Sequence, residues 1–434
     1  MERVFPLLEE AFWKGIEAAS PERAIPAHLK SEGGRLLVNR DGRWEDISPG
    51  VRGRLLIIST GKAAGGMYRA AVKVTGIPHV GIVASPDPHV SCPGADHFRG
   101  GHPFPDSGSV ASARAILSAM AGIGEQDTLL YLISGGSSSV VALPEGKIPL
   151  EDKVAAIRAV MHAGASIFQL NSLRKAISRV KGGKLARGLA PCRGCALVIS
   201  DVPGSDLSVI GSGPLFAGGS PPDPLGIIEE LSVGGKIPPS VMACLREGRE
   251  GETEVIPVAS IPHVVIADNR RALDAAGTFL AAKGYGVVIS DLQYQGEALA
   301  AGISLGKEAI ALREKAPPGK TAWICGGETV VTVRGGGRGG RNQELAIGAA
   351  LSLDGTEGVA GLSAATDGID GNSTAAGGFF DGRLIGRGRE AGMEHERYIA
   401  ESDSSAFLAG TGYSFTTGPT GTNVMDLFMC LIDR

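Results

Sequence analysis

The feature that most constrains this fold is a repeated alternation of short apolar segments with predicted helices. Arg54–Ser59, Val80–Ser85 and Thr128–Ile133 are short and apolar, which is typical of buried strands. A helix predicted at about Gly108–Met120 precedes the last of them. Strands that alternate with helices imply crossover connections, so we expect an α/β fold with a mainly parallel sheet.

The chain is long enough for two or three domains. It has 434 residues, and a domain commonly has about 150. A second series of strands and helices starts with a strand predicted at His263–Ala267, and Gly248–Pro262 is the best candidate boundary. We therefore expect two α/β domains, residues 1–250 and 251–434.

The composition favours a compact enzyme or binding protein. Glycine makes up 65 of the 434 residues, about twice its usual share, and occurs in short runs that indicate tight strand-to-helix loops. The net charge of −4 and the lack of a basic block argue against a nucleic-acid partner. No apolar run is long enough to span a membrane, and the first residues do not open a signal peptide. We therefore expect a cytoplasmic protein without a membrane partner.

The six cysteines give little sign of metal or redox chemistry. Only Cys192 and Cys195 have the spacing of metal ligands, and no second pair completes a zinc site. We expect reduced, structural thiols, with metal or redox chemistry as the alternative.

The segment Thr321–Leu353 carries the clearest candidate for an anion site. It predicts a strand, a turn, a second strand at Thr329–Arg334, a glycine-rich loop at Gly335–Gly340 and a helix from about Arg341. Few side chains block the loop, and a helix start offers unpaired N–H groups, so together they favour phosphate. Arg341 lies at the positive end of the helix dipole, which suggests a negative partner nearby. A surface turn with a solvated arginine is the alternative.

Lys62 repeats this electrostatic oddity, because it follows a predicted strand and lies at a predicted helix start. It is not a Walker A lysine, since Leu56 occupies the position of the first glycine and Ala63 that of the Ser/Thr. Lys62 and Arg341 fall in different predicted domains. Two such cations facing one cleft would suit a substrate with several negative charges, as phosphoryl transfer requires.

Other polar residues lie in loops that follow predicted strands. Asp201 and Asp206 follow one strand, and Asp367 and Asp370 follow another. These carboxylates could hold Mg²⁺ or accept a proton from an attacking hydroxyl, but turn and cap roles are equally common for aspartate. His102 lies in a loop and is either a ligand contact or an ordinary satisfied histidine.

A further polar set falls on a helix predicted at about Leu170–Leu189. Asn171, Arg174, Ser178 and Lys181 follow one another at intervals of three and four residues, so they should share one face. A solvated face is the usual explanation for such a set, and a substrate-binding face is the alternative.

The glycine-rich loop also fits a dinucleotide fingerprint. Gly335, Gly337 and Gly340 satisfy G-x-G-x-x-G, and Asp354 follows at roughly the expected spacing. However, Asp354 falls before the next strand rather than at its far end, and the fingerprint does not explain Arg341. A nicotinamide site is therefore the second hypothesis.

Taken together, these motifs resemble the class II glycerate kinases, whose C-terminal part is known as the MOFRL domain. The similarity covers nearly the whole chain in the family's order. The matching stretches are TGKAAGGM (60–67), GHPFPD (101–106), ISGGSSS (133–139), NSLRKAISRVKGGKLA (171–186), SDVPGSDLSVIGSGP (200–214), GGETVVTVRGGGRGGRNQE (326–344), TDGIDGNSTAAGG (366–378) and TGPTGTNVMDL (417–427).

The resemblance implies a fold and an activity. It implies a Rossmann-like N-terminal glycerate kinase domain, here residues 1–250, a C-terminal MOFRL domain, here residues 251–434, and an active site in the cleft between them. It also implies ATP-dependent phosphorylation of D-glycerate, usually to 2-phosphoglycerate. The residues on which such enzymes are thought to depend correspond here to Lys62 and Arg341.

On this basis we hypothesise that a glycerate hydroxyl attacks the γ-phosphorus of MgATP in line. Lys62 and Arg341 are expected to stabilise the transferring group, with Asp201 or Asp367 as Mg²⁺ ligand or base. Arg174 is expected to hold the substrate carboxylate. The other predicted substrate contacts are Asn171, Lys181 and His102, and the predicted nucleotide contacts are Ser134, Gly135, Gly136, Ser137, Gly337, Gly339 and Gly340.

Three questions stay open at this point. An NAD(P)-dependent hydroxypyruvate reductase is an alternative, since older labels of the family include that name. A non-catalytic sugar-acid binding protein is another. The oligomeric state is open as well, with a homodimer as one candidate.

Overall fold

The structure is a computed structural model that describes residues 4–434 except 188, 190, 191, 217, 219–221, 251–260, 316 and 317. Its internal contacts divide the chain into two compact units. The first unit is Pro21–Ile266, and the second combines Met1–Ser20 with Ala267–Arg434. Described residues near both ends of the chain therefore belong to the second unit.

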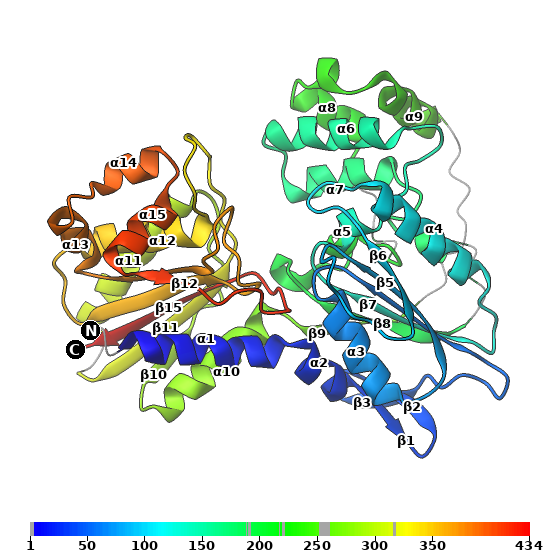
Figure 1. Cartoon of the computed structure of the whole chain (residues 1–434), viewed down its shortest axis with the longest axis horizontal. Helices are drawn as coiled ribbons and strands as arrows, with labels where there is room; N and C mark the ends of the chain where they lie inside the picture. Colours follow the sequence, from blue (N-terminus) through cyan, green and yellow to red (C-terminus); the bar gives the residue numbers. More distant parts are fainter. Residues whose placement is uncertain are drawn as a thin grey trace. The chain divides into compact units, whose positions relative to one another are not determined.

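The first unit is organised around a six-stranded sheet with the strand order β6-β5-β4-β7-β8-β9 (Figure 1). The pairs β6–β5, β5–β4, β4–β7 and β7–β8 are all parallel. The strands are β4 (Leu55–Thr60), β5 (His79–Ser85), β6 (Ala95–Arg99), β7 (Thr128–Ile133), β8 (Arg193–Ile199) and β9 (His263–Ala267).

The central strands are buried along their whole length, which explains their continuous apolar sequences. Helix α4 packs on the sheet face that carries Leu56, Ile58 and Tyr131. Helix α3 contacts β4, β5 and β7. The helices that follow these strands are α3 (Ala64–Thr75), α4 (Ser107–Ala121) and the short α5 (Ser137–Val140).

Two further parts of the first unit were not predicted as such from the sequence. One is an antiparallel sheet of β1 (Leu29–Glu32), β2 (Arg35–Arg40) and β3 (Arg43–Asp46). The other is a helical group with its own apolar core. Its helices are α6 (Leu150–His162), α7 (Ile167–Ala176), α8 (Pro224–Glu230) and α9 (Pro239–Glu250), and α2 (Pro21–His28) begins the unit.

The second unit has a mixed sheet with the order β10-β11-β15-β12-β13-β14. Only β10 and β11 pair in parallel, and the other neighbours are antiparallel. The strands are β10 (Gly286–Ile289), β11 (Lys320–Gly327), β12 (Val359–Ala365), β13 (Gly377–Asp381), β14 (Ser414–Phe415) and β15 (Asp426–Asp433).

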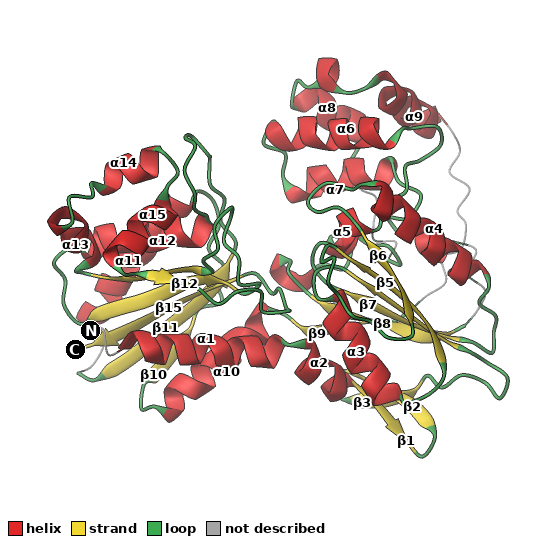
Figure 2. Ribbon diagram, viewed as in Figure 1, coloured by secondary structure: helices red, strands yellow, loops and turns green. Residues whose placement is uncertain are grey.

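Helices cover both faces of this second sheet, with α1 and α10 on one face and α11 and α12 on the other (Figure 2). The N-terminal helix joins this unit through aromatic contacts, since Phe5 stacks on Phe379 and Phe12 meets Phe415 edge to face. The helices are α1 (Phe5–Ala19), α10 (Asn269–Ala282), α11 (Ala298–Lys315), α12 (Arg341–Leu353), α13 (Leu384–Glu390), α14 (His395–Ala400) and α15 (Ser404–Thr411).

The α/β class and the mainly parallel first sheet are confirmed. Some local predictions are wrong. The segment Thr329–Arg334 forms no strand, since only Val330 makes an isolated bridge. The helix expected over Leu170–Leu189 ends at Ala176, so Ser178 and Lys181 do not continue its polar face.

The structure also distributes the predicted domain segments differently from the sequence pattern. Strand β9, expected to start the second domain, adds to the sheet of the first unit. Residues 4–20, expected in the first domain, belong to the second unit. The expected boundary at 250 and 251 adjoins residues outside those described. Within the described part of the chain, no helix is long and apolar enough to cross a bilayer.

Candidate active site

Several predicted site residues gather at one edge of the first unit's parallel sheet. Because β4, β6, β7 and β8 run in the same direction, the segments after them emerge along the same edge. These segments carry Lys62 after β4, His102 after β6, Ser134 after β7 and Asp201 after β8. The edge is the usual location of a ligand site in an open α/β sheet.

The side chains of Ser134 and Ser137, in the loop after β7, are buried and bonded within the protein. Ser134 Oγ accepts from the backbone N–H of Ala63 at 3.0 Å, and Ser137 Oγ lies 2.8 Å from a threonine hydroxyl of β4. These hydroxyls therefore fix the loop. By contrast, the backbone N–H groups of Gly135 and Gly136 find no acceptor among the residues described. Two adjacent free donors of this kind suit an anion.

Lys62 and His102 meet at this loop. The backbone N–H of Lys62 donates to the carbonyl of Gly135 at 2.8 Å. A Cβ at Gly136, whose φ is +81°, would lie 3.0 Å from His102 Cδ2 and 3.3 Å from Lys62 Cγ. The glycine is therefore needed both for its backbone conformation and for the close approach of these two side chains.

Lys181 contacts the same loop directly and Asn171 is linked to it through Ser212, although the two residues do not share a helix. Lys181 Nζ donates to the carbonyl of Ser138 at 2.6 Å. Ser138 Oγ lies 2.9 Å from Ser212 Oγ, which donates to Asn171 Oδ1 at 2.8 Å. The predicted substrate residues are thus brought together, but by a polar chain through serines rather than by a helical face.

Arg174, on α7, lies beside Lys181 and a third cation that the sequence analysis missed. This is Lys153 on α6, which is 1% exposed. One pocket is lined by Lys153, Arg174 and Lys181 together. A signal for Lys153 was present, because it occupies the apolar stripe that continues with Ala156 and Val160. A lysine in such a stripe is buried when the helix packs.

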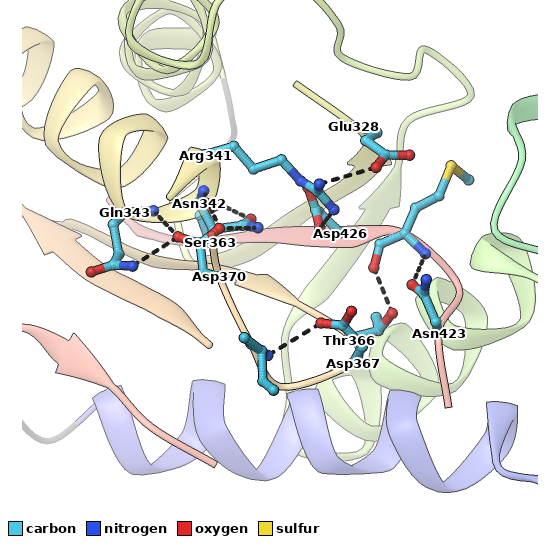
Figure 3. Close-up of polar contacts among 12 residues, drawn as sticks. Glu328, Arg341, Asn342, Gln343, Ser363, Thr366, Asp367, Asp370, Asn423 and Asp426 are labelled. Carbon is cyan, nitrogen blue, oxygen red and sulfur yellow. Dashed lines mark hydrogen bonds and ion pairs between the residues drawn. The ribbon is translucent and has the colours of Figure 1, made fainter. Parts of the chain in front are cut away.

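In the second unit, Arg341 has negative partners within the protein (Figure 3). Its Nε and Nη2 donate to the two oxygens of Asp426 at 2.5 and 2.9 Å, and Nη1 lies 3.0 Å from Glu328 Oε1. Burial opposes the charge, but attraction by Asp426 and Glu328 leaves the pKa of Arg341 raised. The expectation of a negative partner for this cation is therefore met by two carboxylates.

The first turn of α12 is capped by a carboxylate of the chain itself. Asp370, which is 1% exposed, accepts from the backbone N–H groups of Asn342 and Gln343 at 3.1 and 2.9 Å (Figure 3). Burial raises the pKa of Asp370 to about 6, although these hydrogen bonds oppose the shift. The N–H groups that were expected to receive a phosphate at this helix start thus bind Asp370.

Most glycines of the preceding loop are explained by close packing. A Cβ at Gly340 would lie 2.3 Å from Asp370 Cγ, and one at Gly337 would lie 2.4 Å from Asp403 Cβ. A Cβ at Gly339 would lie 2.1 Å from Ser404 Oγ. Hydrogen bonds also engage the backbone N–H groups of Gly337 and Gly339. The loop is rich in glycine because other parts of the same unit lie against it.

This loop nevertheless borders a pocket of about 480 Å³. Exposed valines, among them Val330 and Val333, form apolar walls, and Arg341 lies at its lining. Glu344 also lines it and is 7% exposed. Burial and the nearby Glu297 and Asp370 raise the pKa of Glu344 to about 7. The pocket is large enough for a small organic ligand.

The two predicted metal ligands fall in different units. Asp201 follows β8 in the first unit, and Asp367 follows β12 in the second, where its Oδ1 accepts from the backbone N–H of Ile369 at 3.1 Å. Among the described residues, no three Asp, Glu, His or Cys side chains gather as a metal-binding group. One or two carboxylates are sufficient when Mg²⁺ arrives bound to phosphate oxygens.

Comparisons with known proteins give the family. Residues 7–246 match a family described as "Domain of unknown function (DUF4147)", and residues 321–426 match the MOFRL family. A D-glycerate 2-kinase of Thermotoga maritima is 35% identical over 438 residues, covering 99% of each chain. A relative from Agrobacterium vitis that carries the provisional name hydroxypyruvate reductase is 34% identical over 401 residues, covering 88% of each chain.

A solved structure agrees over the full length. The crystal structure of a glycerate kinase from Thermotoga maritima is 33% identical and covers 100% of both chains, with a TM-score of 0.83.

Proposed function

The chain belongs to the glycerate kinase family, and on that premise we propose that it transfers the γ-phosphoryl group of ATP to D-glycerate. The product would be 2-phosphoglycerate. In the proposed step a glycerate hydroxyl oxygen forms a bond to the γ-phosphorus while the bond from that phosphorus to the bridging oxygen breaks. ADP leaves with the electron pair, and the hydroxyl proton passes to an aspartate.

The observation that carries this proposal is the convergence of unpaired donors in the first unit. The N–H groups of Gly135 and Gly136 lie beside Lys62 and His102 at the carboxyl edge of a parallel sheet. Fixed positive groups of this kind stabilise the charge that spreads over the phosphoryl oxygens in the transition state. We assign Lys62 this role, and the backbone of residues 134–137 the contacts to nucleotide phosphates.

The acceptor is assigned to the neighbouring polar residues. Arg174 would hold the carboxylate of D-glycerate, because a guanidinium matches a carboxylate with two parallel hydrogen bonds. Asn171, Lys181 and His102 would be further contacts of the substrate. All four residues belong to the first unit.

The second unit would contribute Arg341 and the pocket beside it. The pocket of about 480 Å³ is bordered by Gly337, Gly339 and Gly340, and its valine walls suit the planar base of a nucleotide. Arg341 would stabilise the phosphates and would share its charge with Glu328 and Asp426. That Lys62 and Arg341 act on one bound nucleotide stays a prediction.

Asp201 and Asp367 are the proposed proton acceptor and Mg²⁺ ligand, in an order that we leave open. The metal would enter with ATP and neutralise phosphate oxygens. The expected homodimer and the expected cytoplasmic location also stay predictions.

A coupled assay of ADP release tests the proposed function. MgATP should yield ADP only when D-glycerate is present, and phosphorus NMR of the product should show a phosphoryl group on the 2-hydroxyl. Release that is independent of D-glycerate would exclude the proposal. A phosphoryl group on the 3-hydroxyl would correct only the position.

The alternative is a hydroxypyruvate reductase, because the Agrobacterium vitis relative carries that provisional name. That enzyme would oxidise NADH or NADPH with hydroxypyruvate and would need neither ATP nor a metal. A non-catalytic sugar-acid binding protein would show a higher melting temperature with D-glycerate and no turnover with either set of reagents.

A further inference from the structure

Two buried lysines and one partly exposed arginine meet at one narrow pocket in the first unit. Lys153 is 1% exposed and Lys181 is 3% exposed. Arg174 completes the group. The rest of the pocket comes from prolines of the loop after β6, from serines of the loop after β7 and from an apolar residue of α6. Among the described residues, no acidic side chain lines it.

The protein supplies these cations with hydrogen-bond acceptors but with no counter-ion in direct contact among the residues described. Lys153 Nζ donates to the carbonyl of Ile177 at 2.6 Å, and Lys181 Nζ donates to two carbonyls at 2.6 and 3.2 Å. The guanidinium of Arg174 makes no hydrogen bond or ion pair with the residues described. None of the three forms an ion pair within that part of the chain, and the two lysines donate only to backbone carbonyls.

The carboxylate that attracts Lys153 is already engaged elsewhere. Glu145 Oε2 lies 2.9 Å from Lys184 Nζ, which also donates to the carbonyls of Lys175 and Ser178. The charged and titratable groups that act on Lys153 are Lys184 and Arg174, which repel its charge, and Glu145 and Cys244, which favour it. The local balance is therefore positive.

This arrangement costs free energy as long as the pocket holds no anion. Burial, and then repulsion by the neighbouring cations, lowers the pKa of Lys153 to about 7. Burial likewise lowers the pKa of Arg174 to about 10, and the pKa of Lys181 falls well below its usual value. A buried lysine either gives up its proton or is paired, and an anionic ligand would supply the missing partner.

The size of the pocket and one more side chain restrict the kind of ligand that could bind there. The pocket measures about 10 Å³, which admits about one water-sized group and excludes a nucleoside. Asn171 lies one helical turn before Arg174 and is 3% exposed, and its Nδ2 has no hydrogen-bond partner. A buried donor without an acceptor beside three cations favours a small anionic group at the end of a larger molecule.

We propose that Lys153 completes, with Arg174 and Lys181, a subsite for the carboxylate of the acceptor substrate, which selects small hydroxy acids over neutral polyols. The proposal rests on the proposed function, since that function supplies an acceptor with a carboxylate. Lys153 acts here as a specificity residue that touches the substrate carboxylate, whose charge does not change in the reaction, and not the reacting hydroxyl. Removing it should therefore change the Michaelis constant more than the turnover number.

The test compares Lys153→Met with Lys147→Met, an exposed lysine just before α6 that controls for the loss of one charge. Lys153→Met should raise KM for D-glycerate by about tenfold to a hundredfold, as expected for a lost hydrogen bond between charged groups. Its kcat and its KM for ATP should stay within about threefold. Lys147→Met should match the wild type. An unchanged KM for D-glycerate in Lys153→Met would overturn the subsite.

A second measurement needs no variant and no turnover. In the wild-type protein without nucleotide, D-glycerate should raise the melting temperature, whereas glycerol and the neutral methyl ester of D-glycerate should not. Because the anion restores the proton on Lys153, calorimetry in two buffers near pH 8 should show proton uptake, and affinity should fall as pH rises above 7. Equal shifts with glycerol would overturn the proposal. A larger rise in melting temperature with inorganic phosphate than with D-glycerate at the same concentration would also overturn the proposal, in favour of a phosphate subsite.

The two proposals fail in different ways. Absence of turnover with MgATP and D-glycerate rejects the kinase but leaves the binding measurement to decide the subsite. Normal turnover with an unchanged KM in Lys153→Met rejects the subsite and leaves the kinase intact.

Discussion

The two units differ in whether their buried and partly buried positive charges have carboxylate partners. In the second unit Arg341 is held by Asp426 and Glu328, and even the first turn of α12 is capped by Asp370. In the first unit Lys153, Arg174 and Lys181 surround a pocket without a carboxylate. When a charge is balanced within the protein, removing one partner leaves the other uncompensated and destabilises the fold. A charge that is not balanced is available to a ligand and costs stability until the ligand arrives.

The largest expected effect is on catalysis by the first unit. Lys62→Met should lower kcat/KM by about a thousandfold or more, because a preorganised cation at the transferring phosphoryl group would be lost. The melting temperature should change little. Steady-state kinetics and a thermal melt check both parts. If Lys62→Met kept near-normal activity, Lys62 and the loop after β7 would not form the phosphoryl site.

The next effect concerns the balanced charge of the second unit. Arg341→Met should lower the free energy of unfolding by about 3–5 kcal/mol, because Asp426, whose side chain is 1% exposed, would be left as an uncompensated buried carboxylate. Urea unfolding measures the change. The double variant Arg341→Met with Asp426→Leu should recover much of the loss, since both partners would then be apolar. A stable single variant would break the comparison between the units.

Replacing the unbalanced charge should change the free energy of unfolding in the opposite direction. Lys153→Met should raise the free energy of unfolding of the unliganded protein by about 1–4 kcal/mol at pH 6. The folded-state pKa of Lys153, about 7, lies below its unfolded value, so the unfolded state binds more protons between the two. Wild-type stability should therefore rise from pH 7 toward pH 10.5, and the advantage of the variant should shrink. Urea unfolding at pH 6 and pH 9 would reveal this, and destabilisation at pH 6 would contradict the comparison.

The smallest effect tests the pocket beside Arg341. Val333 is 72% exposed and lines it, so Val333→Asp should fold normally and raise KM for ATP by about tenfold, or about 1.4 kcal/mol, by placing a carboxylate near nucleotide phosphates. KM for D-glycerate should stay the same. Val51→Asp, at a fully exposed valine of the first unit, is the matched control. Equal KM values for ATP in both variants would show that the nucleotide does not bind in this pocket.

Sequence patterns predicted the sheet edges better than the contacts made there. Buried parallel strands such as β4 and β7 have continuous apolar sequences, so the positions of Lys62 and the Ser134–Ser139 loop followed directly. The helix expected over Leu170–Leu189 was too long, because Ile177 begins a turn that spacing alone does not distinguish from a continuing helix.

Long-range pairing was the part that sequence could not supply. Asp426 lies 85 residues from Arg341 and is brought to it by the antiparallel pairing of β15 with β11, where Gly327 faces Asp426. Asp370, in the segment between β12 and β13, lies 28 residues from Asn342, from whose backbone N–H it accepts a hydrogen bond. Lys153 was missed because a lysine in an otherwise apolar stripe has no charge signal until the helix that buries it is known. Each omission concerns a partner set by tertiary structure.

The placement of α1 in the second unit has a consequence for the order in which a nascent chain acquires its structure. Because domains generally fold as units, we expect the first unit to fold while the rest of the chain is still being synthesised. Phe5 and Phe12 can pack only after Phe379 and Phe415 have been synthesised. During translation the first helix is therefore an exposed amphipathic segment tethered to a folded body. A fragment that starts at Ala267 would lack its aromatic cover and should aggregate unless the first twenty residues are supplied as a separate peptide.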